Sequence, residues 1–238
     1  MAIDEISLVI PAHNEEKRIL NTLRVYSKFF DENFDKADII VVANNCSDKT
    51  VEIIEKFSEG NPSVRVLEIP HKVGKGGAVL AGLKNAKYDY CGFIDADDAF
   101  ELKDLTRMIN SLNDYDVAIA SKWIGKSFSE VNEPFFRKIM SRGWNFLIRL
   151  MIGIGFSDTQ AGAKFFRKSA FNSINHNFIC TGFEFDVELL CRFKNKNLNI
   201  LEVPVTTRHM PNSSFKVSSI YSMFRKLIKL SELKSNLK

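Results

Sequence analysis

Cysteine is scarce and ungrouped in this chain. Among the 238 residues there are four cysteines, and they show neither a C-x-x-C pair nor another metal-ligand spacing; they are Cys46, Cys91, Cys180 and Cys191. A sequence without such groups gives no sign of a disulfide framework or a zinc site. We therefore expect free thiols in a reducing compartment.

Long apolar runs and a strong charge of either sign are also missing. The longest apolar stretch, residues 146–156, contains Arg149 and is shorter than the about 20 residues that cross a bilayer. Asp4 and Glu5 interrupt the start of the chain, so we expect no signal peptide. The formal net charge is only +4, which gives no reason to expect a nucleic-acid partner. We expect a cytoplasmic protein that is peripheral at the cytoplasmic face of a membrane.

Short apolar runs alternate with amphipathic patterns through the first half of the sequence. Continuous apolar strands joined by helices predict an α/β fold with a mostly parallel sheet that helices flank. We expect one catalytic domain over residues 1–217 and a basic amphipathic helix over 218–238. The expected strands are 6–11, 39–42, 64–69, 90–94 and 117–120, with two more near 163–166 and 198–203. The expected helices are 15–30, one that Ser47 and Asp48 cap, 78–86, 102–112, 135–154 and 184–194.

Polar segments follow three of these strands directly. They are residues 11–15, residues 43–45 and the acidic segment Asp95-Ala96-Asp97. Ligands of such sheets bind beyond the carboxyl ends of the strands. The three segments are therefore predicted to converge on one edge of the sheet and to form a binding site there.

The acidic segment is a candidate metal site. Asp95 and Asp97 are one residue apart at the end of a strand, so both carboxylates can address one cation. Mg²⁺ and Mn²⁺ favour few protein carboxylates and keep positions open for phosphate oxygens. The alternative is an exposed acidic turn that also caps the next helix, a role that suits Asp98 better.

Three further patterns each have two interpretations. Gly74, Gly76 and Gly77 allow backbone N–H groups to approach a phosphate, or they form a flexible turn before a helix. The acids Glu184, Asp186 and Glu188 shape a sugar pocket, or they are solvated helix caps. The helix over 135–154 interleaves apolar and basic residues, as does the C-terminal one, which is typical of a core helix with a solvated face or of a helix at a membrane surface.

Five motifs occur in an order that resembles one family. They are SLVIPAHNE (7–15), KGGA (75–78), DAD (95–97), DTQAGAKFF (158–166) and EVPV (202–205). This order resembles family-2 glycosyltransferases, and within them the dolichyl- or polyprenyl-phosphate sugar synthases. The D-T-Q-x-G-x-K-x-F segment and the following GFEFD (182–186) are most similar to the dolichyl-phosphate glucosyltransferase branch. The resemblance covers about residues 6–216.

The resemblance implies a GT-A fold, in which a nucleotide sugar is bound with Mg²⁺ or Mn²⁺. Asp97 would be the main metal ligand, and Asp95 would lie on the nucleotide side and share the metal. The resemblance also implies a nucleotide-sugar site and a set of phosphate or acceptor contacts. The nucleotide-sugar site would comprise Pro11, Ala12, His13, Glu15, Val42, Asn44, Lys75, Asp95, Ala96 and Asp97. The phosphate and acceptor contacts would be Lys122, Arg137, Arg208 and Lys216, with Asp97, Asp158 and Arg137 as catalytic residues.

The sequence departs from the family at three positions. The family commonly has acids at Ala43 and Asn44, and their absence leaves the base of the donor open, so that both UDP-glucose and GDP-mannose remain candidates. Dolichyl-phosphate mannose synthases tend to have glutamine where Ala99 stands, which favours glucose.

The expected reaction moves a hexose to dolichyl or polyprenyl phosphate with inversion. Asp158 would be the base for a hydroxyl acceptor, whereas with a phosphate acceptor it would support neighbouring groups. The alternatives are a GDP-mannose-dependent dolichyl-phosphate mannose synthase and a soluble family-2 enzyme that acts on a hydroxyl of a glycan or glycolipid. A nucleotidyltransferase would have a Gly- and Arg-rich loop after the first strand, where this chain has Pro-Ala-His-Asn-Glu.

Overall fold

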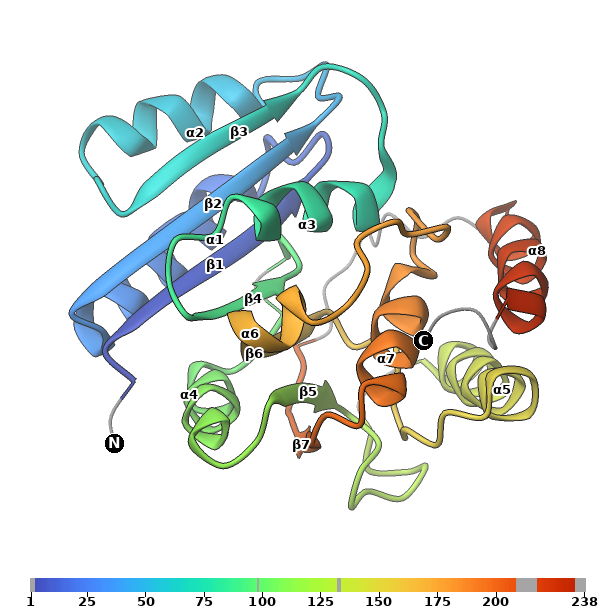
Figure 1. Ribbon diagram of the computed structural model, residues 1–238. Coiled ribbons are helices and arrows are strands. Elements are labelled where there is room, and N and C mark those ends of the chain that lie inside the picture. Colours follow the sequence, from blue (N-terminus) through green and yellow to red (C-terminus); the bar gives the residue numbers. More distant parts are fainter. Residues whose placement is uncertain (1–2, 98, 132–133, 209–217, 234–238) are drawn as a thin grey trace.

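A seven-stranded sheet forms the centre of the molecule (Figure 1). The computed structural model describes residues 3–97, 99–131, 134–208 and 218–233. In chain order the strands are β1 (Glu5–Ala12), β2 (Lys36–Asn44), β3 (Val64–Ile69), β4 (Tyr90–Ile94), β5 (Val117–Ser121), β6 (Ala163–Arg167) and β7 (Ile200–Pro204). Their order in the sheet is β3-β2-β1-β4-β6-β5-β7, and only β6 runs antiparallel to its neighbours. The predicted mostly parallel α/β sheet is confirmed.

Helices cover both faces of the sheet, because each face of its central strands is apolar. One hydrophobic cluster joins β1 and β2 to the first, second and fourth helices, and another joins the opposite face to the remaining ones. The helices are α1 (Ile19–Asn33), α2 (Thr50–Glu59), α3 (Gly74–Lys84), α4 (Leu102–Asn110), α5 (Phe135–Ile152), α6 (Lys168–Asn172), α7 (Phe185–Asn195) and α8 (Ser218–Leu233), with a 3₁₀ turn at Ser111–Asn113. The division of the chain at residue 217 stays a prediction.

The strand order reverses between β1 and β4. From β1 the chain first adds β2 and β3 on one side and then returns to place β4 on the other side. Helix α1 lies on one face of the sheet and α3, which connects β3 to β4, crosses the other. The carboxyl ends of β1 and β4 therefore meet where the strand order reverses, which is the place of the ligand crevice in such sheets. Asp95 follows β4 directly, so the predicted convergence of the acidic segment with residues 11–15 is confirmed.

The expected helix over 78–86 begins earlier, at Gly74, so the interpretation of the glycines as a flexible turn before that helix is wrong. Gly74 has a φ of 79°, and a Cβ there would lie 2.3 Å from the carbonyl oxygen of Thr181. A Cβ on Gly76 would lie 2.2 Å from Cβ of Phe185. The glycines therefore let the segment before α7 pack directly against the start of α3.

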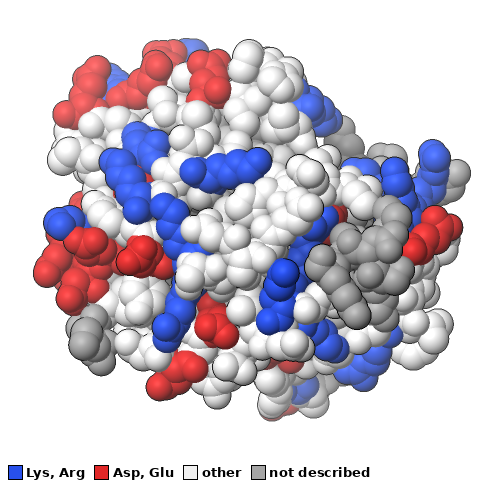
Figure 2. Space-filling view, in the orientation of Figure 1, with Lys and Arg blue, Asp and Glu red and all other residues white. Residues whose placement is uncertain are grey.

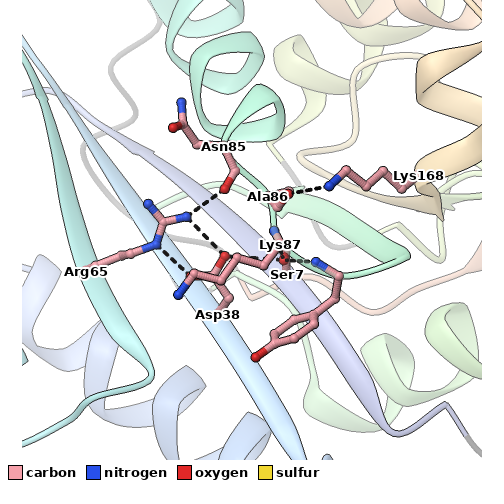
Figure 3. A network of polar contacts seen from close by, with 8 residues as sticks. Ser7, Asp38, Arg65, Asn85, Ala86, Lys87 and Lys168 are labelled. Atoms are coloured by element: carbon pink, nitrogen blue, oxygen red, sulfur yellow. Dashed lines mark hydrogen bonds and ion pairs between the residues drawn. The ribbon is translucent and has the colours of Figure 1, made fainter.

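A polar network holds the amino-terminal edge of the sheet, opposite the crevice (Figure 3). The side chain of Asp38 is almost fully buried and accepts hydrogen bonds from Arg65 Nε at 2.7 Å and from Ser7 Oγ at 3.3 Å. Ser7 Oγ in turn accepts the backbone N–H groups of Lys87 and Tyr88. This network joins β1, β2 and β3 to the segment that enters β4.

We expect Asp38→Ala to lower the free energy of unfolding by about 2–4 kcal/mol, because Arg65 and Ser7 lose a buried partner. Lys36→Met is the control, since it breaks an exposed ion pair with Glu5 at the same edge and should leave stability unchanged. Urea denaturation of both variants measures the difference. Equal stability of Asp38→Ala and the wild type would show that the network adds nothing.

Candidate active site

The acidic segment after β4 packs closely against the segment before β6. The backbone N–H of Asp95 donates to the carbonyl oxygen of Gly162 at 2.9 Å. A Cβ on Gly162 would lie 2.0 Å from Oδ2 of Asp95, so a side chain there would displace that carboxylate from its present position. The DAD and DTQAGAKFF motifs are therefore parts of one site.

Lys75 lies beside Asp95 in the first turn of α3. Its Nζ is 2.6 Å from Asp95 Oδ1 and 3.9 Å from Asp186 Oδ2. Burial on its own would lower the pKa of Lys75, but the carboxylates of Asp95 and Asp186 outweigh that effect and hold the pKa above its usual value. Lys75 is therefore a fixed positive charge in the crevice.

Asp97 has an oxygen that the described part of the chain leaves without a partner. Its Oδ1 is buried and accepts no hydrogen bond from any described residue. Burial raises the pKa of this carboxyl, as does repulsion by Asp95, while Arg18 and Lys75 act in the opposite direction. An orphaned buried carboxylate oxygen next to a second acid fits a divalent cation.

The ligand set that the protein offers such a cation is small. Within the described residues, no group of three or more His, Cys, Asp or Glu side chains could hold a metal ion. Asp95 and Asp97 alone suit Mg²⁺ or Mn²⁺, which take one or two carboxylates and complete their shell with water and phosphate oxygens. The residues present therefore fit a metal that is bound together with a diphosphate.

Arg18 is a site residue that the sequence reasoning missed. Its guanidinium forms a bidentate pair with Glu15 just before α1. The hydrogen bond to Glu15 raises the pKa of Arg18, and the charges of Asp97 and Asp95 add to this effect. The only feature of the sequence that could have indicated this pair is the spacing of three residues between Glu15 and Arg18.

The expected helix over 15–30 begins later, at Ile19, because residues 15–18 form a turn.

Asn44 holds the start of α3. Its Oδ1 accepts the backbone N–H of Val73 at 3.0 Å, and its Nδ2 donates to the carbonyl oxygen of Gly74 at 3.2 Å. An aspartate could accept the first bond but could not donate the second. This explains why an amide stands where the family has an acid. The role of Asn44 at the nucleotide base stays a prediction.

The other residues expected at the nucleotide lie at the ends of β1 and β2. His13 Nδ1 lies 2.7 Å from the carbonyl oxygen of Asn44. Pro11 pairs with Val42 across the two strands. The side chains of Ala12 and Val42 are buried in the core, so only their main chains can contact a ligand.

Asp158 is buried near the end of β5. Its Oδ2 accepts the backbone N–H of Lys122 at 3.3 Å, and its own N–H donates to Glu202. Burial raises the pKa of Asp158, while Lys122 and two backbone N–H groups counteract this in part. Next to it, Thr159 donates to Asn145 of α5 from both its backbone N–H and its hydroxyl.

The three acids at the start of α7 are neither exposed nor unpaired. Glu184 pairs with Lys226 of α8, Asp186 with Lys164, and Glu188 with Arg192; all three acids are almost fully buried. The interpretation as solvated helix caps is therefore wrong. Of the two residues expected to cap the helix after β2, Asp48 accepts the backbone N–H of Thr50 at the start of α2, although the N-cap position itself is held by Lys49.

The remaining predicted phosphate contacts lie on separate segments of the chain, and part of the set can be placed. The backbone N–H of Arg208 donates a hydrogen bond to the carbonyl oxygen of Ala99, which is close to the acidic segment. Arg137 is exposed in the first turn of α5. Lys216 and Asp98 lie outside the described residues. The catalytic and phosphate roles of these residues stay predictions.

The sequence of this chain is similar to those of several known enzymes. The chain is 32% identical over 216 residues to a dolichyl-phosphate beta-glucosyltransferase of Drosophila melanogaster. The aligned segment covers 84% of this chain and 66% of that protein. It is 28% identical over 237 residues to a dolichyl-phosphate beta-glucosyltransferase of Trichomonas vaginalis, which covers 94% of this chain and 72% of that protein.

Among solved structures, glucosyl-3-phosphoglycerate synthase from Mycobacterium tuberculosis in complex with Mn²⁺, UDP and glucosyl-3-phosphoglycerate has a similar fold. Its TM-score is 0.70 at 18% identity, over 99% of this chain and 81% of that chain. This likeness confirms the GT-A fold. The model of the family "Glycosyl transferase family 2" matches residues 7–174, and the chain therefore belongs to glycosyl transferase family 2.

Proposed function

We propose that this protein transfers glucose from UDP-glucose to dolichyl or another polyprenyl phosphate, with inversion at the anomeric carbon. The observation that carries the proposal is the orphaned carboxylate of Asp97 beside Asp95 and Lys75, at the strand-order reversal of a family-2 chain. Curated relatives that bear the name dolichyl-phosphate beta-glucosyltransferase support the sugar and the acceptor.

On the donor side, Asp97 and Asp95 would hold Mg²⁺ or Mn²⁺ against the diphosphate. The bound metal would supply electrostatic stabilisation of the departing nucleoside diphosphate. Lys75 keeps its positive charge beside Asp95, and Arg18 contributes a second positive charge next to the same pair of acids. His13 and Glu15, at the end of β1, line the edge where the nucleotide would lie.

On the acceptor side, an oxygen of the lipid phosphate attacks the anomeric carbon as the bond from that carbon to the UDP oxygen breaks. A phosphate is anionic at neutral pH, so no proton has to be removed. Asp158 then serves to fix the main chain at Lys122, whose ammonium attracts the phosphate. This assigns Asp158 a supporting role rather than that of a base.

A transfer assay with labelled UDP-glucose, GDP-mannose and UDP-N-acetylglucosamine, polyprenyl phosphate and Mg²⁺ or Mn²⁺ tests the proposal. We expect label from UDP-glucose in the organic phase, and we expect Asp97→Asn to lower the rate by roughly 100-fold or more. Asp114→Asn, at an exposed position, is the control and should be neutral. Transfer from GDP-mannose alone would indicate a mannose synthase, and transfer only to water-soluble hydroxyl acceptors would contradict the lipid-phosphate acceptor.

Asp158→Asn should keep its turnover within about tenfold of the wild type, because a phosphate acceptor needs no general base. The asparagine variant should also be more stable than the wild type, by a margin that grows as pH rises. Since burial raises the pKa of Asp158 above its unfolded value of about 3.9, the folded chain binds more protons than the unfolded chain, and stability falls as pH increases through that window. The asparagine does not ionise, so its advantage in Tm should be small near pH 4 and larger at neutral pH.

Thermal melts of both proteins across this pH range, together with the transfer assay, check the Asp158 prediction. A loss of turnover of several hundredfold without a change in fold would assign Asp158 the role of a base.

We further propose that α5 attaches the protein to the cytoplasmic face of a membrane. Large apolar side chains on α5 are exposed, namely Phe135, Phe136, Ile139, Phe146 and Leu150. Arg137, Arg142 and Arg149 are interleaved with them and suit anionic headgroups. Figure 2 shows the largest group of acidic side chains at the top left, over α2, with smaller groups elsewhere on this face. Among the described residues, no helix is long and apolar enough to cross a bilayer.

The double variant Phe136→Ser/Leu150→Ser should lose binding to anionic vesicles without losing stability, because both side chains are about 70% exposed. Tyr115→Ser removes an exposed aromatic residue elsewhere and should bind vesicles like the wild type. Flotation on a density gradient measures the binding. Failure of the wild type to float, or equal flotation of the double variant, would contradict attachment through α5.

A further inference from the structure

One buried carboxylate lies between two lysines beneath the candidate active site. Asp186, in the first turn of α7, is 1% exposed. Its Oδ1 accepts a hydrogen bond from Lys164 Nζ at 2.6 Å, and its Oδ2 lies 3.9 Å from Lys75 Nζ. Lys164 itself is fully buried. In the proposed reaction, neither Asp186 nor its contacts with the two lysines takes part directly in a chemical step.

The two lysines lead to the two halves of the site. Lys75 continues to Asp95, on the side of the donor and the metal. Lys164 also donates to the carbonyl oxygen of Ala161 at 2.9 Å, in the segment that begins with Asp158. A single side chain on α7 thus reaches the donor side through one lysine and the acceptor side through the other.

The charge balance shows what Asp186 does for each lysine. Without its carboxylate, the ammonium of Lys164 would be a buried charge without an ion-pair partner among the described residues and with only the more distant Asp158 to offset it, which is an unfavourable arrangement. Lys75 would keep only Asp95 as a close counter-ion. A stronger attraction to Asp95 would then compete with the role of that carboxylate in binding a metal and a diphosphate.

We propose that Asp186 is a positioning residue that shares the charge of Lys75 with Asp95, as a second carboxylate 3.9 Å from Nζ behind the 2.6 Å pair, and thereby prepares the metal and nucleotide site. The inference rests on the proposed function, because it assumes a nucleoside diphosphate at Asp95. Asp186 is not itself a group that touches substrate, since it is buried behind the two lysines. Its effect passes through Lys75.

A double variant separates positioning from simple structural support. Asp186→Asn leaves Lys164 uncompensated and should lower Tm. Adding Lys164→Met removes that buried charge with a side chain of similar length, so Tm should return towards the wild-type value. Neither variant restores the second counter-ion of Lys75. The double variant should therefore be stable and still defective at the donor site.

The readout is UDP binding by calorimetry with Mn²⁺ in excess and with no acceptor present. We expect the Kd of the double variant to be raised roughly tenfold or more, in line with the effect of losing a residue that orients a ligand-binding group. Glu188→Gln is the matched control, because Glu188 lies two residues further along α7 and is buried against Arg192. It should lower Tm and leave the Kd for UDP within about twofold of the wild type.

Wild-type UDP affinity in the stable double variant would overturn the inference, as would an equal loss of affinity in Glu188→Gln. Failure of the proposed function gives a different pattern. In that case the wild type binds UDP and the variants differ as expected, but no sugar reaches polyprenyl phosphate in the transfer assay.

Discussion

The close approach of the segment before β6 to the end of β4 is the contact on which the site depends. Two glycines allow it. A Cβ on Gly162 would meet the Asp95 carboxylate at 2.0 Å, and a Cβ on Gly92 would meet the ring of Phe165 at 2.4 Å. Because β6 is antiparallel to β4, the segment that holds Asp158 enters the sheet beside the acidic pair. Residues proposed for the donor side and for the acceptor side, from distant parts of the sequence, thereby share one edge.

The buried charges around this contact come in balanced groups. Asp95 and Asp186 flank Lys75, Asp186 also holds Lys164, and Arg18 pairs with Glu15. Breaking such a pair leaves an uncompensated charge, which costs more than the pair contributes. Asp97 is the exception, since its Oδ1 has no partner among the described residues. An active site needs such an exception, because a carboxylate that the protein already satisfies has little to offer a cation.

The sequence was sufficient to predict the α/β sheet and the convergence of the acidic pair with the end of β1, because strand ends and polar segments are local patterns. It was insufficient where a role depends on a distant partner. Asn44 bonds to the backbone at residues 73 and 74, and Glu184 to Lys226, across separations that no local periodicity encodes. The start of α3 was placed four residues too late for the same reason, since the glycines at its beginning pack against the segment at Thr181 and Phe185.

Helices α5 and α8 have similar amphipathic sequence patterns but bury their apolar side chains to different extents. Both mix apolar and basic residues, yet α8 packs Met223, Leu227 and Leu230 inward and pairs Lys226 with Glu184. On α5 the inward positions include Ile148 and Ile152, and large apolar side chains remain outside. The pattern alone does not reveal which apolar side faces the core. Since Asn145 of α5 also bonds to Thr159, the helix with the exposed apolar surface is joined directly to the segment of Asp158, on the proposed acceptor side of the site.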